Sequence, residues 1–441
     1  MAHFHSASTM QESFIQFLWQ YQLFTKNNLC TEEGQPLRII RTGKLNTDAG
    51  PDFSEARILI GEVEWSGQVE IHIKGSDWFH HRHQQNAVYD TVILHVVWQH
   101  DTPVYRTNGT LIPTLCLQPY TPASTLDRYQ LLTTATACIP CAGQFGSVPD
   151  LYRRQALDQA VMQRLQTKSR LVLQLLQANR SDWEETTYQL LAQNLGMKTN
   201  ASPLLRLAKS TPLKLLRKHG DSLVQMEALL FGQAGLLEGQ FSDHYPNELK
   251  QEYQFLCHKY QLETSRLSST EWKWAKLRPG NFPEIRIAQL AALVHAHKSL
   301  FSYFSLAEPE DEKNTLSHCA VSPYWTKHYR FDKLSVGIHA GFGDISRQNI
   351  IINTKVTLLA AWAEAKDEDA HYHHAVRVLE SLPAEENKII RRWRSLGLAA
   401  TNAFDSQGCI ELYNHFCSER QCLRCPAGFF LLKNSRQSHP I

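Results

Sequence analysis

The hydrophobic pattern of this chain changes once, near residue 140, and that change restricts the fold more than any other feature. Before it, apolar residues mostly alternate with polar ones or form short β-branched runs, which is typical of strands. After it, nearly every segment repeats apolar residues at the i, i+3, i+4 spacing of an amphipathic helix. The sequence therefore predicts an α/β domain at residues 1–140, a larger all-helical domain at 141–408 and a short C-terminal segment at 409–441.

The first part of the chain predicts a mixed sheet with helices. We expect a helix over 12–24, a second helix that begins at Ser76 or Asp77 and runs to about Tyr89, and one or two strands within 103–120. Four further strands are expected over 37–41, 57–60, 65–74 and 91–98. The last of these, TVILHVVW, is almost entirely apolar, as in a strand that is buried on both faces.

The second part predicts helices separated by turns, with a long break over the Gly-, Ser-, Asp- and Tyr-rich stretch 306–345. No fixed period repeats along it, so the sequence does not support a solenoid. The expected helices are 150–178, 183–195, 202–218, 221–238, 245–260, 283–305, 346–365, 367–380, 384–396 and 402–416.

Composition excludes several classes of protein. A chain of 441 residues that is 43% hydrophobic and 20% charged is long and apolar enough for two or three globular domains, so it is neither disordered nor fibrous. It has no apolar run of membrane-spanning length and no basic-then-apolar leader, so we expect no membrane span and no signal peptide. We therefore expect a cytoplasmic protein, whose ten cysteines are thiols or metal ligands rather than disulfides.

Charge is distributed unevenly along the chain. The formal net charge is only +2, but residues 151–220 carry twelve Lys or Arg against four Asp or Glu, a local net charge of +8. Such a segment suits a polyanionic partner such as nucleic acid. The alternative is a solvated helix face in a protein whose acidic residues lie elsewhere.

Two acidic residues are expected on one side of the predicted sheet. Asp52 follows Gly50-Pro51, and Glu70 lies on the strand 65–74, whose other face is apolar. Two converging carboxylates with a backbone carbonyl are the ligands that Mg²⁺ and Mn²⁺ prefer. The metal would activate a water for phosphodiester hydrolysis, and His72 or Lys74, on the face of Glu70, would position that water. The alternative is a turn at Asp52 and a surface residue at Glu70.

This order of elements resembles the PD-(D/E)XK nuclease superfamily. Pro51-Asp52 is similar to the first half of that motif and Glu70-Ile71 to the second, but His72 stands where the superfamily usually has lysine. Glu12, on the first predicted helix, is placed like the additional carboxylate of many members. The resemblance implies a restriction-endonuclease-like sheet with catalytic residues Asp52, Glu70, His72 or Lys74, and Glu12.

A second resemblance covers nearly the whole chain. It is to a bacterial family of unknown function, so it implies relatives without implying an activity. The segments that carry it are FLWQYQLF (17–24), NTDAGPDF (46–53), GQVEIH (67–72), SDW (76–78), EALLFGQAG (227–235), RPGNFPEIRIAQ (278–289) and the cysteines 417–425.

Histidines are concentrated after the strand 65–74. They are His80, His81, His83, His95 and His100. His80 and His83 are spaced i, i+3, and together with His72 they form a candidate Zn²⁺ site. A third possible function is therefore that of a zinc hydrolase. The chain lacks the His-Glu-x-x-His spacing of zinc hydrolase helices, which favours surface and capping roles instead.

Cysteines gather near the C-terminus and at the junction near residue 140. Cys417, Cys422 and Cys425 lie within nine residues, and Cys138-Ile-Pro-Cys141 forms a Cys-x-x-Cys turn. Resemblance to the bacterial family favours Cys141, Cys417, Cys422 and Cys425 as ligands of Zn²⁺ or a [4Fe–4S] cluster, whereas spacing alone also allows Cys138 or Cys409. The alternative is a set of buried free thiols.

The sequence thus predicts a divalent-metal-dependent nuclease that acts on DNA or RNA. A non-catalytic nucleic-acid- or protein-binding module with a degenerate nuclease fold is the alternative. A protein partner and an unassigned oligomeric state are compatible with both. Arg278, Arg286 and nearby aromatic residues are further candidates for holding phosphates and stacking bases, although helix capping and core packing are the more common roles of such residues.

Overall fold

The computed structural model describes residues 10–306, 316, 320–335 and 341–433. They form two compact units. The N-terminal unit combines the described residues up to Asp158 with Ser395–Leu398 and those from Ile410 onward. The helical unit comprises Gln159–Arg394 and Ala399–Cys409. A mixed sheet with helices followed by a largely helical region is the predicted fold class, which is confirmed.

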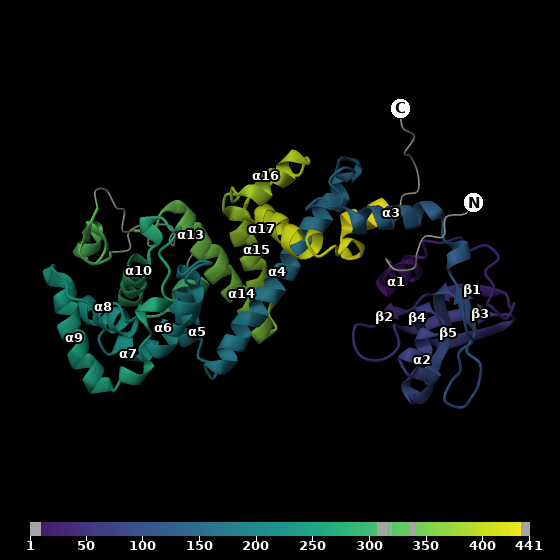
Figure 1. Cartoon of the computed structure of the whole chain (residues 1–441), viewed down its shortest axis with the longest axis horizontal. Coiled ribbons are helices and arrows are strands. Elements are labelled where there is room, and N and C mark those ends of the chain that lie inside the picture. Colours follow the sequence, from purple (N-terminus) through teal and green to yellow (C-terminus); the bar gives the residue numbers. More distant parts are fainter. Residues whose placement is uncertain (1–9, 307–315, 317–319, 336–340, 434–441) are drawn as a thin grey trace. The chain divides into compact units, whose positions relative to one another are not determined.

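The N-terminal unit is built on a six-stranded mixed sheet of order β1-β3-β4-β5-β6, in which β2 also pairs with β3 (Figure 1). Strands β3 and β4 are antiparallel, whereas β5 runs parallel to β4 and β6 runs parallel to β5. The strands are β1 (Leu37–Arg41), β2 (Lys44–Leu45), β3 (Phe53–Ile60), β4 (Val63–Lys74), β5 (Val92–Gln99) and β6 (Thr114–Cys116).

Alternation along β4 and β5 gives the sheet two different faces. In the register of these strands, Ile71 lies beside Val96, and Glu70 lies beside His95. Helix α1 (Glu12–Tyr21) covers the apolar face, and α2 (Asp77–His80) covers the face that carries Glu70 and His95 (Figure 1). The face under α2 is therefore the one that combines burial with polar side chains.

The predicted helix from Ser76 to Tyr89 is wrong in length. Helix α2 ends at His80, and two 3₁₀ turns, η2 (His83–Gln85) and η3 (Ala87–Thr91), follow it. Arg82 breaks the helix because its φ of 60° lies in the left-handed region. The break turns His83 back toward the sheet, and His83 is buried.

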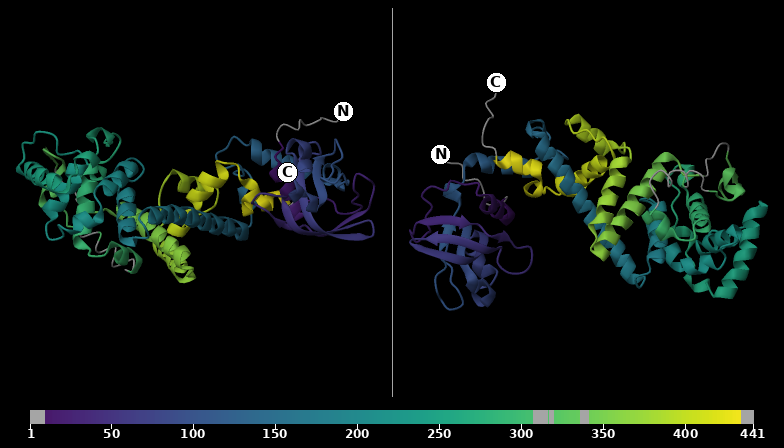
Figure 2. Two further views of the ribbon diagram at one scale, coloured as in Figure 1. Left: turned by 90° about the horizontal axis from the view of Figure 1, so that it is seen from below. Right: turned by 180° about the vertical axis from the view of Figure 1, so that it is seen from behind.

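The helical unit buries one extended apolar core. Helices α5 and α6 pack together, α8 packs against α9 and α10, and α14 packs against α15 (Figure 2). The helices beyond the sheet are α3 (Ala123–Thr134), α4 (Asp150–Ala178), α5 (Trp183–Leu195), α6 (Ala201–Ser210), α7 (Leu213–Arg217), α8 (Leu223–Gln233), α9 (His244–Tyr260), α10 (Pro283–Ala296), α11 (Leu300–Leu306), α13 (Asp344–Ile350), α14 (Val356–Lys366), α15 (Asp369–Ser381), α16 (Lys388–Ser395), α17 (Ala403–Glu411) and α18 (Pro426–Lys433).

Most predicted helices are present, but several are interrupted. The one predicted over 202–218 is split between α6 and α7 at Thr211-Pro212, because proline ends a helix at the preceding residue. π-helical turns at Ile351–Lys355 and Leu412–Cys417 interrupt two others. The break predicted over 306–345 lies partly outside the described residues. Among the helices that the structure describes, none offers an apolar stretch that could cross a membrane.

Candidate metal centre

A tight loop before β3 places Asp52 at the edge of the sheet. Gly50 has a φ of 114°, which glycine adopts without strain, so the chain reverses just before Pro51. The Asn46 side-chain amide donates to the Pro51 carbonyl oxygen at 3.0 Å, and its backbone N–H donates to the Asp52 carbonyl oxygen at 2.7 Å. These two bonds close the loop and fix the backbone that carries the Asp52 carboxylate.

Asp52 and Glu70, called the acid pair below, are linked by two hydrogen bonds between their carboxylates and backbone N–H groups. Glu70 Oε2 accepts the Asp52 N–H at 3.0 Å, and Asp52 Oδ2 accepts the N–H of Ile71 at 3.0 Å. Gln16 on α1 donates to Asp52 Oδ1 at 2.9 Å. The structure therefore brings together two carboxylates that are 18 positions apart in the sequence, as predicted from their strands.

Burial makes the acid pair and the neighbouring Glu12 costly to ionise. Burial, followed by the charge of Glu70, raises the pKa of Asp52 to about 7, and burial raises that of Glu70 to about 7. Burial and the nearby charges of Asp52, Glu70 and Asp77 raise the pKa of Glu12 to about 7. Among the ion pairs of the described residues, none joins Lys or Arg to these three acids. A bound cation would offset their repulsion.

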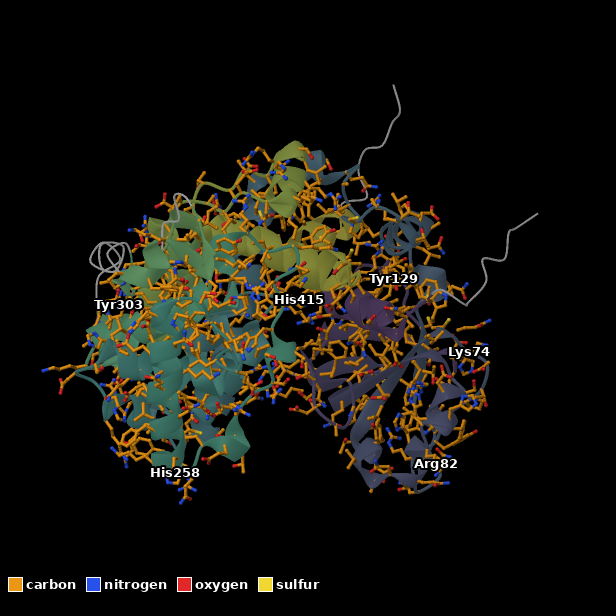
Figure 3. All side chains as sticks on the ribbon, turned by 60° about the vertical axis from the view of Figure 1, so that its left-hand side comes forward. Lys74, Arg82, Tyr129, His258, Tyr303 and His415 are labelled. Carbon is orange, nitrogen blue, oxygen red and sulfur yellow. The ribbon has the colours of Figure 1, made fainter. Side chains whose placement is uncertain are left out.

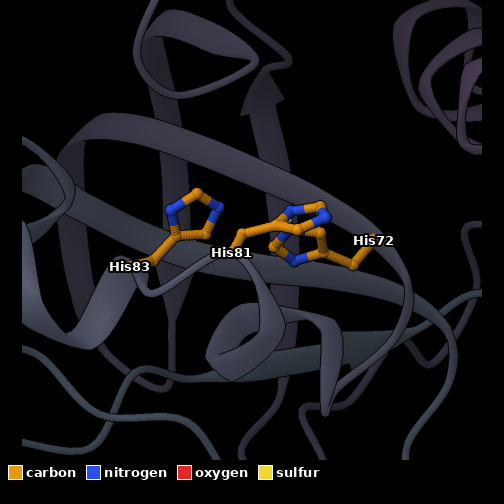
Figure 4. Close-up of side chains that lie close together, drawn as sticks. All are labelled: His72, His81 and His83. Atoms are coloured by element: carbon orange, nitrogen blue, oxygen red, sulfur yellow. Dashed lines mark hydrogen bonds between the residues drawn. The ribbon is translucent and has the colours of Figure 1, made fainter.

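Three histidines, called the imidazole cluster, face the other oxygen of Glu70. They are His72, His81 and His83, and their nearest nitrogen atoms all lie within 4.8 Å of one another (Figure 4). His72 Nε2 lies 3.1 Å from His81 Nδ1 and 3.6 Å from Glu70 Oε1. His83 Nε2 lies 3.2 Å from the same Glu70 oxygen. One carboxylate thus spans the acid pair and the imidazole cluster.

Buried neighbours fix the orientation of these rings. The His72 Nδ1 atom is 2.8 Å from His95 Nε2, which lies on β5. Trp78 meets His72 and His83 edge-on, and Tyr89 stacks on His83 at a centroid distance of 3.7 Å. Burial, followed by the other imidazoles, lowers the pKa of His72 to about 2, and burial lowers that of His83 to about 4. Both rings are therefore neutral near pH 7.

Two predicted site residues lie elsewhere. Lys74 is exposed at the outer edge of the N-terminal unit (Figure 3). His80 is also exposed, with its Nδ1 atom 3.3 Å from Asp77 Oδ1. The predicted set of His72, His80 and His83 therefore does not converge, and His81 takes the place of His80.

Sequence reasoning also missed Tyr89, His95 as the partner of His72, and Gln16. Their positions depend on the break at Arg82 and on pairing between distant elements, which no local pattern records.

The candidate cysteines are mostly buried but are less tightly grouped than the imidazoles. Among the described residues, no three sulfur atoms lie within 4.8 Å of one another. Burial, followed by the charges of Cys425 and Cys422, raises the pKa of Cys141 to about 12, so these thiols lie within electrostatic reach. Burial, followed by the charges of all three other thiols, raises the pKa of Cys417. Cys409 belongs to the helical unit, and Cys319 lies outside the described residues.

Arg286 has a structural role in the helical unit. Its guanidinium group is buried and donates to Gln289, Asn281 and Ser346. These bonds link α10 to the turn before it and to α13, although Arg286 Nε has no hydrogen-bond partner; burial leaves the group poorly placed to hold a phosphate.

Comparison with known proteins identifies a family. The model of the family described as "Protein of unknown function (DUF2851)" matches residues 12–388, so the chain belongs to this family. No curated protein and no solved structure matches the chain. The comparisons therefore give no evidence of a relation to the PD-(D/E)XK nucleases.

Proposed function

We propose that this protein is a divalent-metal-dependent nuclease that hydrolyses phosphodiester bonds of DNA or RNA. The observation that carries the proposal is the acid pair, in which two partly or fully buried carboxylates are held side by side without a Lys or Arg ion pair among the described residues. Such groups remain ionised at neutral pH at a free-energy cost unless a cation binds them. Mg²⁺ and Mn²⁺ are the cations that carboxylate oxygens suit best.

The chemistry follows from what a divalent ion supplies. Bound to the acid pair, it would lower the pKa of a coordinated water and stabilise the charge that develops on the phosphate. Asp52 and Glu70 would hold the ion, and Glu12 would orient coordinated water from α1. His72 does not suit the role of water-positioning residue, because both of its ring nitrogens already face other side chains inside the fold.

The order of the elements supports the same proposal. The succession of α1, the antiparallel pair β3 and β4, α2 and the parallel strand β5 is similar to that of the PD-(D/E)XK nucleases. Asp52 directly precedes β3 and Glu70 lies on β4, as the two acids of that motif would. The departure is at His72, where those enzymes usually have lysine.

The helical unit offers a basic cavity that suits a polyanion. The cavity has a volume of about 730 Å³. Its lining combines Lys168, Lys198 and Lys209 with asparagine side chains and with apolar residues of the surrounding helices. These lysines belong to the segment 151–220 with its local net charge of +8. Phosphate groups are the natural partners of such a surface.

The alternative function is a non-catalytic module that binds nucleic acid or protein. The observation that favours it is the loss of the lysine, since His72 is buried and neutral and cannot supply a positive charge at the scissile phosphate. The basic cavity would serve this function equally well.

Cleavage assays separate the two functions. We would incubate the full chain with single- and double-stranded DNA and RNA in Mg²⁺ or Mn²⁺, beside Asp52→Asn and Glu70→Gln. Glu64→Gln is the matched control, because Glu64 lies on the same strand but is exposed and paired with Arg57. The nuclease predicts cleavage by the wild type and the control alone. Equal cleavage by all variants, or binding of nucleic acid without any cleavage, would favour the alternative.

We also propose that Cys141, Cys417, Cys422 and Cys425 hold Zn²⁺ or an iron–sulfur cluster. Their spacing, their burial and their mutual electrostatic effect support this, because a bound metal stabilises thiolates that would otherwise repel one another. Metal analysis of Cys422→Ser beside Cys30→Ser tests it. Equal zinc and iron contents in both variants and the wild type would contradict it.

A further inference from the structure

We propose that the imidazole cluster and Glu70 Oε1 form a binding site for a transition-metal ion of the Zn²⁺ class. This proposal goes beyond the nuclease, because the ion would bind here whether or not the protein cleaves nucleic acid. His72 and Glu70 come from β4, and His81 and His83 come from the segment that Arg82 bends back toward the sheet.

The three imidazoles lie within 4.8 Å of one another, and three measured distances among the four atoms match those in a tetrahedral site. Zn–N bonds of about 2.0–2.1 Å at tetrahedral angles separate neighbouring ligand atoms by about 3.3 Å. His72 Nε2 and His81 Nδ1 are 3.1 Å apart, and His83 Nε2 and Glu70 Oε1 are 3.2 Å apart. The 3.6 Å between His72 Nε2 and Glu70 Oε1 is equally close to that value.

An unsatisfied nitrogen atom favours a bound ion over a cluster in which the side chains only hydrogen-bond to one another. His83 is 7% exposed, and its Nε2 atom makes no hydrogen bond although it lies near the Glu70 carboxylate. Buried polar atoms are normally satisfied, so an unpaired nitrogen that points into a cluster indicates a missing partner. A metal ion accepts that lone pair and those of the other imidazoles together.

The surroundings have the features of a metal site. The contact between His72 Nδ1 and His95 Nε2 leaves His72 Nε2 to face the cluster, which is how outer residues orient a ligating histidine. Tyr89 and Trp78 hold the His83 ring from two sides. His81 is exposed, so an ion can enter from solvent. Imidazole nitrogen with a single carboxylate selects Zn²⁺ and its neighbours over Mg²⁺.

The site can be tested by zinc binding to the full chain, after a chelator has removed any metal that the protein already carries. Equilibrium Zn²⁺ titration would compare wild type, His81→Ala, His83→Ala and Asp52→Asn. His80→Ala is the matched control, since His80 is an exposed neighbour that faces Asp77 instead. Zinc at the cysteines would be common to all of these proteins, so only the differences between them matter.

We expect His81→Ala and His83→Ala to weaken one zinc-binding event by about 100-fold, with His80→Ala like the wild type. Asp52→Asn should lose cleavage but keep this zinc, which separates failure of the nuclease from failure of the site. His81 is exposed, so the His81→Ala protein should fold. Its unfolding transition, measured without metal and compared with that of the wild type, would check this. Unchanged zinc affinity in a folded His81→Ala or His83→Ala protein would overturn the proposal.

Discussion

Buried carboxylates have different neighbours in the two units of this molecule. In the helical unit, Glu227 is fully buried and accepts hydrogen bonds from the hydroxyls of Tyr245 and Ser322. Glu284 is likewise met by Trp274 Nε1 and by Arg330. In the N-terminal unit, the acid pair faces Glu12 and the imidazole cluster, and these neighbours provide little positive charge. The two acids of the helical unit thus have hydroxyl, indole or guanidinium donors beside them, although Glu227 Oε1 has no hydrogen-bond partner. Among the described residues, the acid pair has no Lys or Arg ion pair, so a cation from outside is the partner that suits it.

The contrast teaches how to separate structural from functional polar clusters. Both units raise the pKa of a buried glutamate to about 7, so burial alone does not distinguish them. The neighbours do. A carboxylate among donors stabilises a packed core, while one among acids and neutral imidazoles is arranged for a cation.

The largest expected effect is on cleavage. Glu70→Gln should lower metal-dependent cleavage at least about 100-fold, because it removes the carboxylate shared by the acid pair and the imidazole cluster. Glu227→Gln, its counterpart in the helical unit, should cleave like the wild type. Initial rates on one labelled substrate would measure both. Parallel losses in the two variants would break the comparison.

The next effect is the pH dependence of stability in the helical unit. The pKa of Glu227 is raised from 4.5 to about 7 by burial, so the folded state binds this proton more tightly than the unfolded state does. This contribution is complete below about pH 4.5 and is lost as the pH rises to about 7, a change of roughly 3 kcal/mol. Urea unfolding at several pH values should show that difference between wild type and Glu227→Gln. Parallel curves would contradict the assignment.

Zinc should stabilise the N-terminal unit selectively. At a free concentration one hundred times the dissociation constant, one bound ion adds about 2.7 kcal/mol. We expect this increment in the wild type and its loss in His83→Ala, measured as the shift of the unfolding transition on adding Zn²⁺. A shift of equal size in both proteins would assign the effect to other ligands.

The smallest effect concerns a single donor to Glu227. Tyr245→Phe removes one of the two hydroxyls that this carboxylate accepts, which should cost about 1–2 kcal/mol of unfolding free energy. Zinc affinity should not change, because the hydroxyl belongs to the helical unit. A stability equal to that of the wild type would show that the carboxylate does not depend on this bond.

Local patterns predicted the fold class and the acid pair for clear reasons. The strand Leu37–Arg41 has the predicted limits, and the alternation along β4 correctly placed Glu70 opposite the apolar face. Asp52 was found because it ends a turn-rich segment in Gly50-Pro51-Asp52 before a predicted strand, and Pro51-Asp52 is similar to half of the nuclease motif. These features depend on periodicity and turn chemistry, which are local.

The imidazole cluster could not be predicted in the same way. Helical spacing pointed to His80 with His83, but the left-handed backbone at Arg82 exposes His80 and brings His81 and His83 to the sheet. Arginine carries no sequence signal for that conformation. The pairing of His72 with His95 depends on the register of two parallel strands, which is set by the whole sheet rather than by either segment.

Counting Mn²⁺ ions bound to the full chain is the most direct test of the central claim, that the polar cluster of the N-terminal unit is a metal site. Mn²⁺ suits carboxylate and imidazole ligands and avoids soft thiolates, so the cysteines should not contribute. Electron paramagnetic resonance of free Mn²⁺ would follow the titration. We predict saturable binding to the wild type and to Glu64→Gln that is lost in Glu70→Gln. Equal binding by all three proteins, or no binding by the wild type, would contradict the account.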